Sequence, residues 1–199
     1  MQEKIIISGT GRCGTTFLMM LFTFLGLDTG YTRDNYFCYL DIESCSGMEN
    51  IDIREPQKII KNPYYFLDNH IKNVMKTVKV KYMIIPIQDY EKSAESREKL
   101  GGLRGGLWEA SNKEEQIKSY YKMMSEYMLN MVRYDIPTIF LDFDRMVSSS
   151  EYLYEKLKSM MEEENVEFEK FDKKFQEVNF IQKKKSKYES SEIIVFYFI

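Results

Sequence analysis

The residues best placed to do chemistry lie near the N-terminus, in the run Gly9-Thr10-Gly11-Arg12-Cys13-Gly14-Thr15-Thr16. Its three glycines let the backbone turn sharply and bring N–H groups close to an anion. Arg12 adds a cation, and Thr15 begins an apolar run that suits a helix, whose N-terminus would present unpaired N–H groups to a negative ligand. The run therefore predicts a phosphate-binding loop; a glycine-rich turn without a ligand is the alternative.

The elements that must position this loop are visible on either side of it. Ile5, Ile6 and Ile7 form a short β-branched run that is typical of a buried parallel strand. The apolar run after the loop predicts a helix from Thr15 to Leu25, and Gly26 provides the stop signal. Strand, loop and helix thus follow one another directly, as a phosphate site in an α/β fold requires.

The loop departs from the P-loop of nucleoside triphosphate enzymes at one position. In the pattern G-x-x-x-x-G-K-[ST], Gly9 and Gly14 have the right spacing, but Thr15 stands where the lysine belongs. That lysine acts on the β- and γ-phosphates, so its replacement weakens the interpretation as an ATPase or kinase. A cation remains in the loop at Arg12.

The pattern G-T-G-R-C-G-T-T-F-L resembles the 5′-phosphosulfate-binding loop of the sulfotransferases, in which a basic residue precedes Ser-Gly-Thr-Thr and apolar residues. Cys13 takes the place of the serine. The resemblance extends in order over residues 5–160. It implies metal-free transfer of a sulfuryl group from 3′-phosphoadenosine-5′-phosphosulfate (PAPS) to a hydroxyl or amine of a small-molecule or carbohydrate acceptor. The implied PAPS-binding residues are Gly11, Arg12, Cys13, Gly14, Thr15, Thr16, Gln88 and Ser96.

A second strand, Lys58 to Ile60, is predicted to end in Lys61-Asn62-Pro63. A lysine at the carboxyl edge of a parallel strand points into the crevice where open α/β sheets bind ligands. The Lys-x-Pro pattern also resembles several sulfotransferases, in which the lysine lies near the transferred group. The resemblance implies that Lys61 and Arg12 are catalytic, offsetting charge on the bridging and sulfuryl oxygens. An exposed lysine beside a turn is the alternative.

The third predicted strand, Val78 to Ile87, leads to the segment implied to hold the 3′-phosphate of PAPS. In sulfotransferases such a strand ends in Arg-[Asp/Asn]-Pro, and a serine eight residues after the arginine joins it on the phosphate. Ser96 has that spacing from Gln88, which replaces the arginine. An amide cannot make the two charge-assisted hydrogen bonds of an arginine guanidinium, so other cationic side chains are the alternatives for binding the 3′-phosphate. These are Arg97, Arg104 and the cluster Lys183, Lys184, Lys185 and Lys187. A plain serine on a helix surface is the alternative for Ser96.

The acceptor site is expected between a long polar connection at 31–55 and a glycine-rich segment at 101–108, which contains the only tryptophan, Trp108. An ordinary exposed loop and a flexible connector are the alternatives. The only histidine, His70, falls within a predicted helix at 65–76 and is interpreted as structural, so no general base is assigned. The candidate acceptor contacts in the first segment are Tyr31, Arg33, Asp34, Tyr36, Tyr39, Asp41 and Glu43.

Composition bounds the class of protein. The 199 residues suit one domain over the whole chain, and a net charge of −3 gives no global basic field to attract nucleic acid or anionic lipid. No secretory signal or membrane-length apolar run is present, and cysteines 13, 38 and 45 lack metal-ligand spacing, so a cytoplasmic protein with reduced thiols is expected. The apolar run 193–199 could form a last strand.

The remaining pattern completes the predicted fold. A capping box at Ser111 opens a helix to about Arg133, a fourth strand covers 137–143, and a helix follows to about Glu163. The charged stretch 162–187 predicts a solvated face, and the resemblance implies a basic loop from Lys183. Alternating strands and helices predict an α/β fold of the P-loop nucleotide-binding kind, a parallel sheet with helices on both faces. Two competing functions remain: a magnesium-dependent phosphotransferase using Asp142 or Asp144, and an inactive nucleotide-binding protein.

Overall fold

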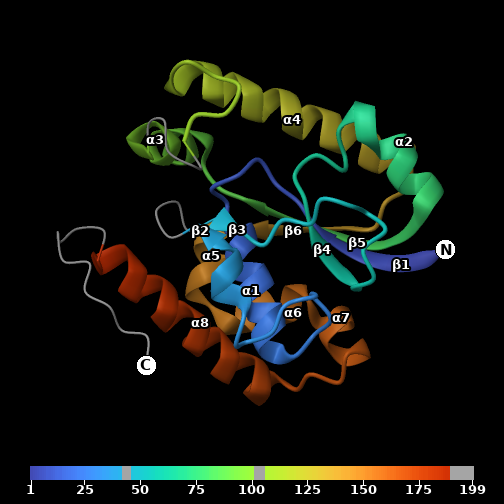
Figure 1. The fold of residues 1–199 in the computed structure, drawn as a ribbon, viewed down its shortest axis with the longest axis vertical. Coiled ribbons are helices and arrows are strands. Elements are labelled where there is room, and N and C mark those ends of the chain that lie inside the picture. Colours follow the sequence, from blue (N-terminus) through green and yellow to red (C-terminus); the bar gives the residue numbers. More distant parts are fainter. Residues whose placement is uncertain (42–45, 101–105, 189–199) are drawn as a thin grey trace.

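A computed structural model of the chain contains a four-stranded parallel sheet with helices on both faces (Figure 1). The structure describes residues 1–41, 46–100 and 106–188. The strand order is β4-β1-β5-β6. The predicted α/β class is therefore confirmed. The strands are β1 (Gln2–Ile7), β4 (Ile59–Lys61), β5 (Val78–Ile87) and β6 (Thr138–Asp142).

The central strand β1 divides its isoleucines between the two faces of the sheet. Ile5 and Ile7 lie in one hydrophobic core and Ile6 in the other, because successive side chains of a strand point to opposite faces. At the carboxyl end of β1, Ile7 is in register with Lys61 of β4 and Ile84 of β5. The loop that follows β1 thus begins between these two neighbouring strands.

The first core lies under α1 (Thr15–Leu25), which packs between the sheet and α8 (Phe168–Tyr188) (Figure 1). Every residue of α1 after Thr15 is buried, as expected of a helix that is apolar all round. Gly26 ends it in the left-handed conformation, and its N–H donates to the carbonyl of Thr23. The predicted stop is confirmed. The same face carries α5 (Phe143–Ser148), α6 (Ser150–Lys156) and α7 (Lys158–Glu163).

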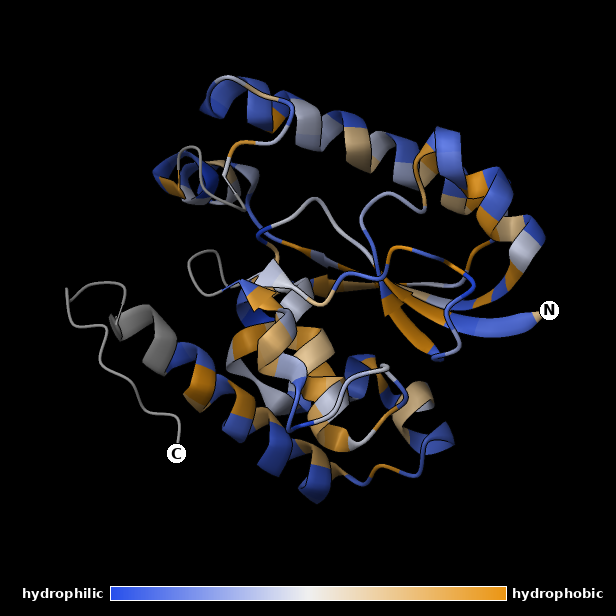
Figure 2. Ribbon diagram, viewed as in Figure 1, coloured by the Kyte–Doolittle hydropathy of each residue, from blue (hydrophilic) through white to orange (hydrophobic). Residues whose placement is uncertain are grey.

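The second core lies between the sheet and α2 (Asp68–Thr77) and α4 (Lys113–Arg133), next to α3 (Tyr90–Leu100) (Figure 1). The start of α4 is capped by Asn112, whose side chain accepts a hydrogen bond from the Glu115 N–H at 2.9 Å. Figure 2 shows hydrophobic residues along the strands and α1, with hydrophilic residues on the outer helices.

The charged stretch 162–187 was predicted as a solvated face, and its charged residues up to Lys183 are exposed or half-buried, as predicted. The basic loop implied from Lys183 is wrong, because this part of the chain is helical. It forms α8, which continues to Tyr188. Phe171, Phe175 and Val178 follow helical spacing and are fully buried against α1. Three apolar residues suffice to dock this helix, although the surrounding charges dominate its composition. The predicted strand at 193–199 lies outside the described residues.

The polar connection at 31–55 contains short elements of its own. They are η1 (Tyr36–Tyr39) and a small antiparallel pair, β2 (Leu40–Asp41) and β3 (Ser46–Gly47). Among the residues that the structure describes, no helix is long and apolar enough to cross a membrane.

Candidate functional site

The loop between β1 and α1 has the backbone that its glycines predict. Gly11, Arg12 and Gly14 have φ angles of 91°, 56° and 84°, in the left-handed region that favours glycine. The loop borders a cavity of about 1110 Å³ at the carboxyl ends of β1, β4 and β5. Seven of the eight residues predicted to bind PAPS line this cavity, and so does Lys61. The seven predicted PAPS-binding residues that line the cavity are Gly11, Arg12, Gly14, Thr15, Thr16, Gln88 and Ser96.

Cys13 is the exception among the predicted residues. Its side chain is fully buried, and Cys13 does not line the cavity. A Cβ added to Gly9 would come within 2.6 Å of the Cys13 sulfur, which therefore packs behind the loop. Burial raises the pKa of the Cys13 thiol. The thiol thus supports the loop from within.

Lys61 supplies a cation where the loop lacks the P-loop lysine. It is buried, with 4 % of its surface exposed, and its Nζ donates to the Thr16 hydroxyl at 2.8 Å. The same ammonium contacts a Glu49 carboxylate oxygen at 2.9 Å and donates to the Gly47 carbonyl at 2.6 Å. Burial lowers the pKa of Lys61 below 10.5, although Glu49 opposes this shift. The alternative of an exposed lysine beside a turn is therefore wrong.

A second polar contact joins the loop to α3. The Arg12 Nε donates to the Ser96 hydroxyl at 3.0 Å, which brings together two predicted residues that are 84 positions apart. Gln88, at the end of β5, accepts a hydrogen bond from Ser93 at 3.1 Å through its amide oxygen, which fixes the orientation of the amide. Ser96 is therefore a cavity residue rather than a plain surface serine.

Arg97, the residue after Ser96, brings a further guanidinium to the loop. It is largely buried, and its Nε and Nη1 donate to the Tyr120 hydroxyl and the Gly106 carbonyl, both at 2.7 Å. A Cβ added to Gly11 would lie 2.1 Å from Arg97 Nη2. The absence of a side chain at Gly11 is thus what admits this arginine. Sequence alone offered Arg97 as one of several replacements for the arginine missing at Gln88; Arg104 lies outside the described residues.

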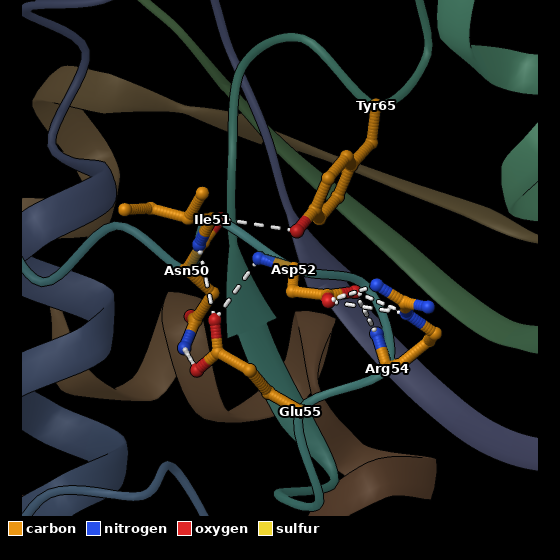
Figure 3. A network of polar contacts seen from close by, with 6 residues as sticks. All are labelled: Asn50, Ile51, Asp52, Arg54, Glu55 and Tyr65. Carbon is orange, nitrogen blue, oxygen red and sulfur yellow. Dashed lines mark hydrogen bonds and ion pairs between the residues drawn. The ribbon is translucent and has the colours of Figure 1, made fainter.

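Glu49 is a cavity residue that the sequence did not single out. Its carboxylate is 44 % exposed, and its neighbour Asn50 binds the segment to β4. The Asn50 N–H donates to the Lys61 carbonyl at 2.8 Å, and the Asn50 side chain accepts from the Lys61 N–H at 2.9 Å. The Tyr65 hydroxyl donates to the Asn50 carbonyl at 3.0 Å, and Glu55 accepts from the Asn50 amide at 3.1 Å (Figure 3). This network holds Glu49 beside Lys61.

The acceptor contacts proposed in the connection 31–55 are not brought to the cavity. Tyr31 and Tyr36 pack against the first core, and Arg33 pairs with Glu177 of α8. From this connection, the cavity is lined instead by Ser46, Glu49 and Ile51. Glu43 lies outside the described residues. The hydrophobic spacing of Tyr31 and Tyr36 is too irregular in sequence to have indicated that they are core residues.

Trp108 and His70 both line the cavity. Trp108 was predicted to contact substrate, and its ring lies with its edge toward Tyr64, with centroids 5.1 Å apart. His70, interpreted as structural, is exposed at the start of α2, 6.4 Å from the Tyr64 ring. It therefore belongs to the margin of the cavity.

Asp142 and Asp144 flank Phe143, which lines the cavity, but their own carboxylates make other contacts. The Asp142 carboxylate caps α5 by accepting from the Arg145 N–H at 2.8 Å, and Asp144 lies 3.6 Å from Lys92. Neither lines the cavity. Among residues 1–41, 46–100 and 106–188, no cluster of three or more histidine, cysteine or acidic side chains could hold a metal ion.

Comparison with protein families, with curated proteins and with solved structures finds no match. The function of the chain therefore has to be inferred from the geometry of its own residues.

Proposed function

We propose that the chain is a sulfotransferase that moves a sulfuryl group from PAPS to a hydroxyl or amine of a small-molecule or carbohydrate acceptor. One observation carries the proposal. The loop lacks the lysine of triphosphate enzymes, and a buried lysine from β4 reaches it instead, with Lys61 Nζ 2.8 Å from Thr16 Oγ1. In PAPS the transferred sulfuryl group is attached to the 5′-phosphate. A cation beside the loop that binds this phosphate would therefore lie close to the reacting group.

The residues around the loop fit the charges of PAPS. Gly11 and Gly14 have no Cβ, which lets the backbone of the loop pack closely against Arg97 and Phe143. The start of α1 offers unpaired N–H groups, together with the hydroxyls of Thr15 and Thr16, for the 5′-phosphate. Arg12 and Ser96, which already contact each other, face the place expected for the 3′-phosphate. Because Gln88 is neutral, the positive charge that binds the 3′-phosphate comes from Arg12 and Arg97.

The chemistry divides between donor and protein. PAPS, when bound, supplies the sulfuryl group: its sulfur bonds to the acceptor oxygen or nitrogen, its bond to the bridging oxygen breaks, and 3′,5′-adenosine bisphosphate (PAP) departs. Lys61, which contacts Thr16 at the start of α1, offsets the negative charge that gathers on the bridging and sulfuryl oxygens, whereas Arg12, bonded to Ser96, is assigned to the 3′-phosphate and not to the transferred group. Glu49 is the carboxylate placed to take the acceptor proton, because it lines the cavity and contacts Lys61.

The first test is thermal stabilisation by PAP, AMP and ATP with magnesium. A ligand at about 100 times its dissociation constant should add about 2.7 kcal/mol of stability. PAP should stabilise the protein well beyond AMP, and Arg12→Ala should remove this difference. Arg33→Ala is the matched control, since Arg33 is an exposed arginine paired with Glu177 away from the cavity, and it should bind PAP normally.

The competing functions give different results in the same assay. Stronger stabilisation by ATP with magnesium than by PAP would favour the phosphotransferase. Stabilisation by PAP without turnover over a broad acceptor panel would favour an inactive nucleotide-binding protein. No stabilisation by any nucleotide would overturn the proposal.

The role of Glu49 is tested separately. Glu49→Gln keeps the size of the side chain and should lower kcat by about 10²- to 10⁴-fold while leaving stabilisation by PAP in place. His70→Gln, on the cavity margin, should retain most of the activity. If the effects on the two variants were exchanged, the base would be His70.

A further inference from the structure

One side of the cavity is built from apolar and aromatic residues, and this surface is named here the aromatic wall. Three of its residues belong to the segment that leaves β4, one comes from the connection before β4, and one comes from the segment before α4. It is made of Ile51, Pro63, Tyr64, Tyr65 and Trp108.

The rings of the aromatic wall are held in place by contacts with the rest of the protein. Tyr64 and Trp108 meet edge to face, with ring planes at 88°. The Arg97 guanidinium lies 5.7 Å from the Trp108 ring centroid, and because Arg97 also packs at Gly11 it connects the wall to the loop. Tyr65 is buried, whereas Tyr64 is 39 % exposed and Trp108 is half-buried. The wall therefore presents fixed ring surfaces to the cavity.

The polar atoms of this region are engaged within the protein. The Tyr65 hydroxyl donates to the Asn50 carbonyl at 3.0 Å. The amide of Asn62, which lines the cavity beside the wall, donates to the same carbonyl at 2.7 Å and accepts from the Tyr64 N–H at 2.7 Å. A sugar carries a hydroxyl on most of its carbons, and burying these hydroxyls without partners is costly. A flat apolar ring has no such requirement and interacts favourably with aromatic edges and faces.

The charged side chains around the wall also favour an uncharged acceptor. Glu49 brings a carboxylate to the cavity next to the wall, and the wall itself contains no cationic side chain. Arg97, which lies over the Trp108 ring, donates hydrogen bonds to Tyr120 and Gly106. The other cations that line the cavity, Arg12, Lys61 and Lys183, do not belong to the wall, so an acceptor ring that lies on the wall meets no cationic side chain of the described residues besides Arg97.

We propose that the aromatic wall binds the ring of an uncharged aromatic alcohol and presents its hydroxyl to Glu49. This inference rests on the proposed function and narrows its acceptor. The ring lies against Tyr64 and Trp108, and the hydroxyl is the only part of the acceptor that needs a polar partner.

Trp108 makes the proposal testable without activity, because it is the only tryptophan in the chain. Its fluorescence is followed during titration of the PAP-saturated protein with 3-phenyl-1-propanol, 3-cyclohexyl-1-propanol and methyl glucoside. The phenyl alcohol should change the emission saturably and bind about two- to tenfold more tightly than the cyclohexyl alcohol, given the usual gain from aromatic pairs. The glucoside should produce no saturable change.

A variant connects this signal to the wall. Tyr64→Leu removes an aromatic ring but keeps an apolar side chain, and it should weaken binding of the phenyl alcohol while leaving stabilisation by PAP unchanged. Tyr64→Phe keeps the ring and should bind the phenyl alcohol like the unmodified protein. Normal melting temperatures of both proteins would show that they fold.

The outcomes separate this inference from the proposed function. Equal or tighter binding of the glucoside or the cyclohexyl alcohol would overturn the inference, and so would loss of phenyl alcohol binding when PAP is present, since the wall would then hold the adenine. If PAP failed to stabilise the protein while the phenyl alcohol still changed Trp108 emission, the sulfotransferase proposal would fail and the ring site would remain.

Discussion

At the scale of single residues, the site depends on charges that reach the loop from elsewhere. Lys61 comes from β4 and Arg97 from α3, whereas Arg12 belongs to the loop itself. Each guanidinium or ammonium group is held by hydrogen bonds to oxygen atoms of the protein. Positioned charges of this kind need no rearrangement when charge develops on a ligand.

The lowered pKa of Lys61 predicts opposite pH trends in activity and stability. As pH rises through the folded pKa, below 10.5, Lys61 loses its proton and kcat should fall. In the window between that pKa and 10.5, the unfolded chain binds more protons than the folded one, so the free energy of unfolding should rise with pH. Urea denaturation compared with Lys61→Met isolates this contribution. A parallel pH trend in the variant would show that another group is responsible.

The close approach of Arg97 to Gly11 predicts unequal effects of two glycine substitutions. Gly26→Ala, with φ 83° and nothing within 4 Å of the new Cβ, should lose about 1 kcal/mol through backbone strain alone. Gly11→Ala, with φ 91°, should lose more and should also weaken PAP binding, because its Cβ collides with the guanidinium. Denaturant titration measures the difference. Equal losses of stability in the two variants would show that Arg97 moves away from the new Cβ without a cost in free energy.

At the scale of elements, α8 decides how the first core is closed. The helix carries many charges, and its buried side consists of a few apolar residues that pack on α1. Phe175 contacts Phe17 edge to face, with centroids 5.6 Å apart. Since Phe17 lies in the first turn of α1, directly after the loop, this packing also fixes the helix N-terminus at the cavity.

Removal of the Phe175 ring should therefore be costly. Phe175→Ala should lower the free energy of unfolding by about 3–5 kcal/mol, the usual range for a buried phenylalanine. Phe140→Ala on β6, where the side chain is 40 % exposed, should cost about 1–2 kcal/mol. Chemical denaturation of both variants provides the comparison. Similar losses would contradict the docking of α8 through this residue.

At the scale of the whole molecule, the strand order determines which residues meet the loop. The neighbours of β1 are β4 and β5, which bring Lys61 and Gln88 to the cavity. The acidic residue Asp142 ends β6, the edge strand, and caps α5. The sheet thus places a cation, and not a carboxylate, beside the predicted phosphate loop.

This arrangement predicts activity that does not depend on magnesium. Asp142→Asn preserves a good helix cap, so its stability should be close to that of the unmodified protein. Its transfer activity should also be unchanged, and a chelator should not inhibit either protein. A large loss of activity in Asp142→Asn, or inhibition by the chelator that magnesium reverses, would favour the phosphotransferase instead.

Much of this architecture follows from local sequence signals. The isoleucine run, the glycines and the apolar run predict β1, the loop and α1, because backbone freedom and side-chain pattern act over a few residues. The bounds predicted for β5 agree with the structure, as does the end of α4 at Arg133. The packing of α8 on α1 was not predicted, because its three buried apolar residues are separated by many charged ones. Their role becomes clear only when α1 is known to lie against them.

The site shows the same division. Sequence by itself predicted a phosphate-type loop, determined that threonine replaces the P-loop lysine, and named Arg12, Lys61 and Ser96 as candidates. Only the tertiary structure decided that Lys61 is buried against Thr16, that Arg97 fills the space left by Gly11, and that Glu49 reaches the cavity while Tyr31 does not. The reason is physical: hydrogen-bond and ion-pair partners far apart in the chain are selected by strand order and packing, which local propensities do not encode.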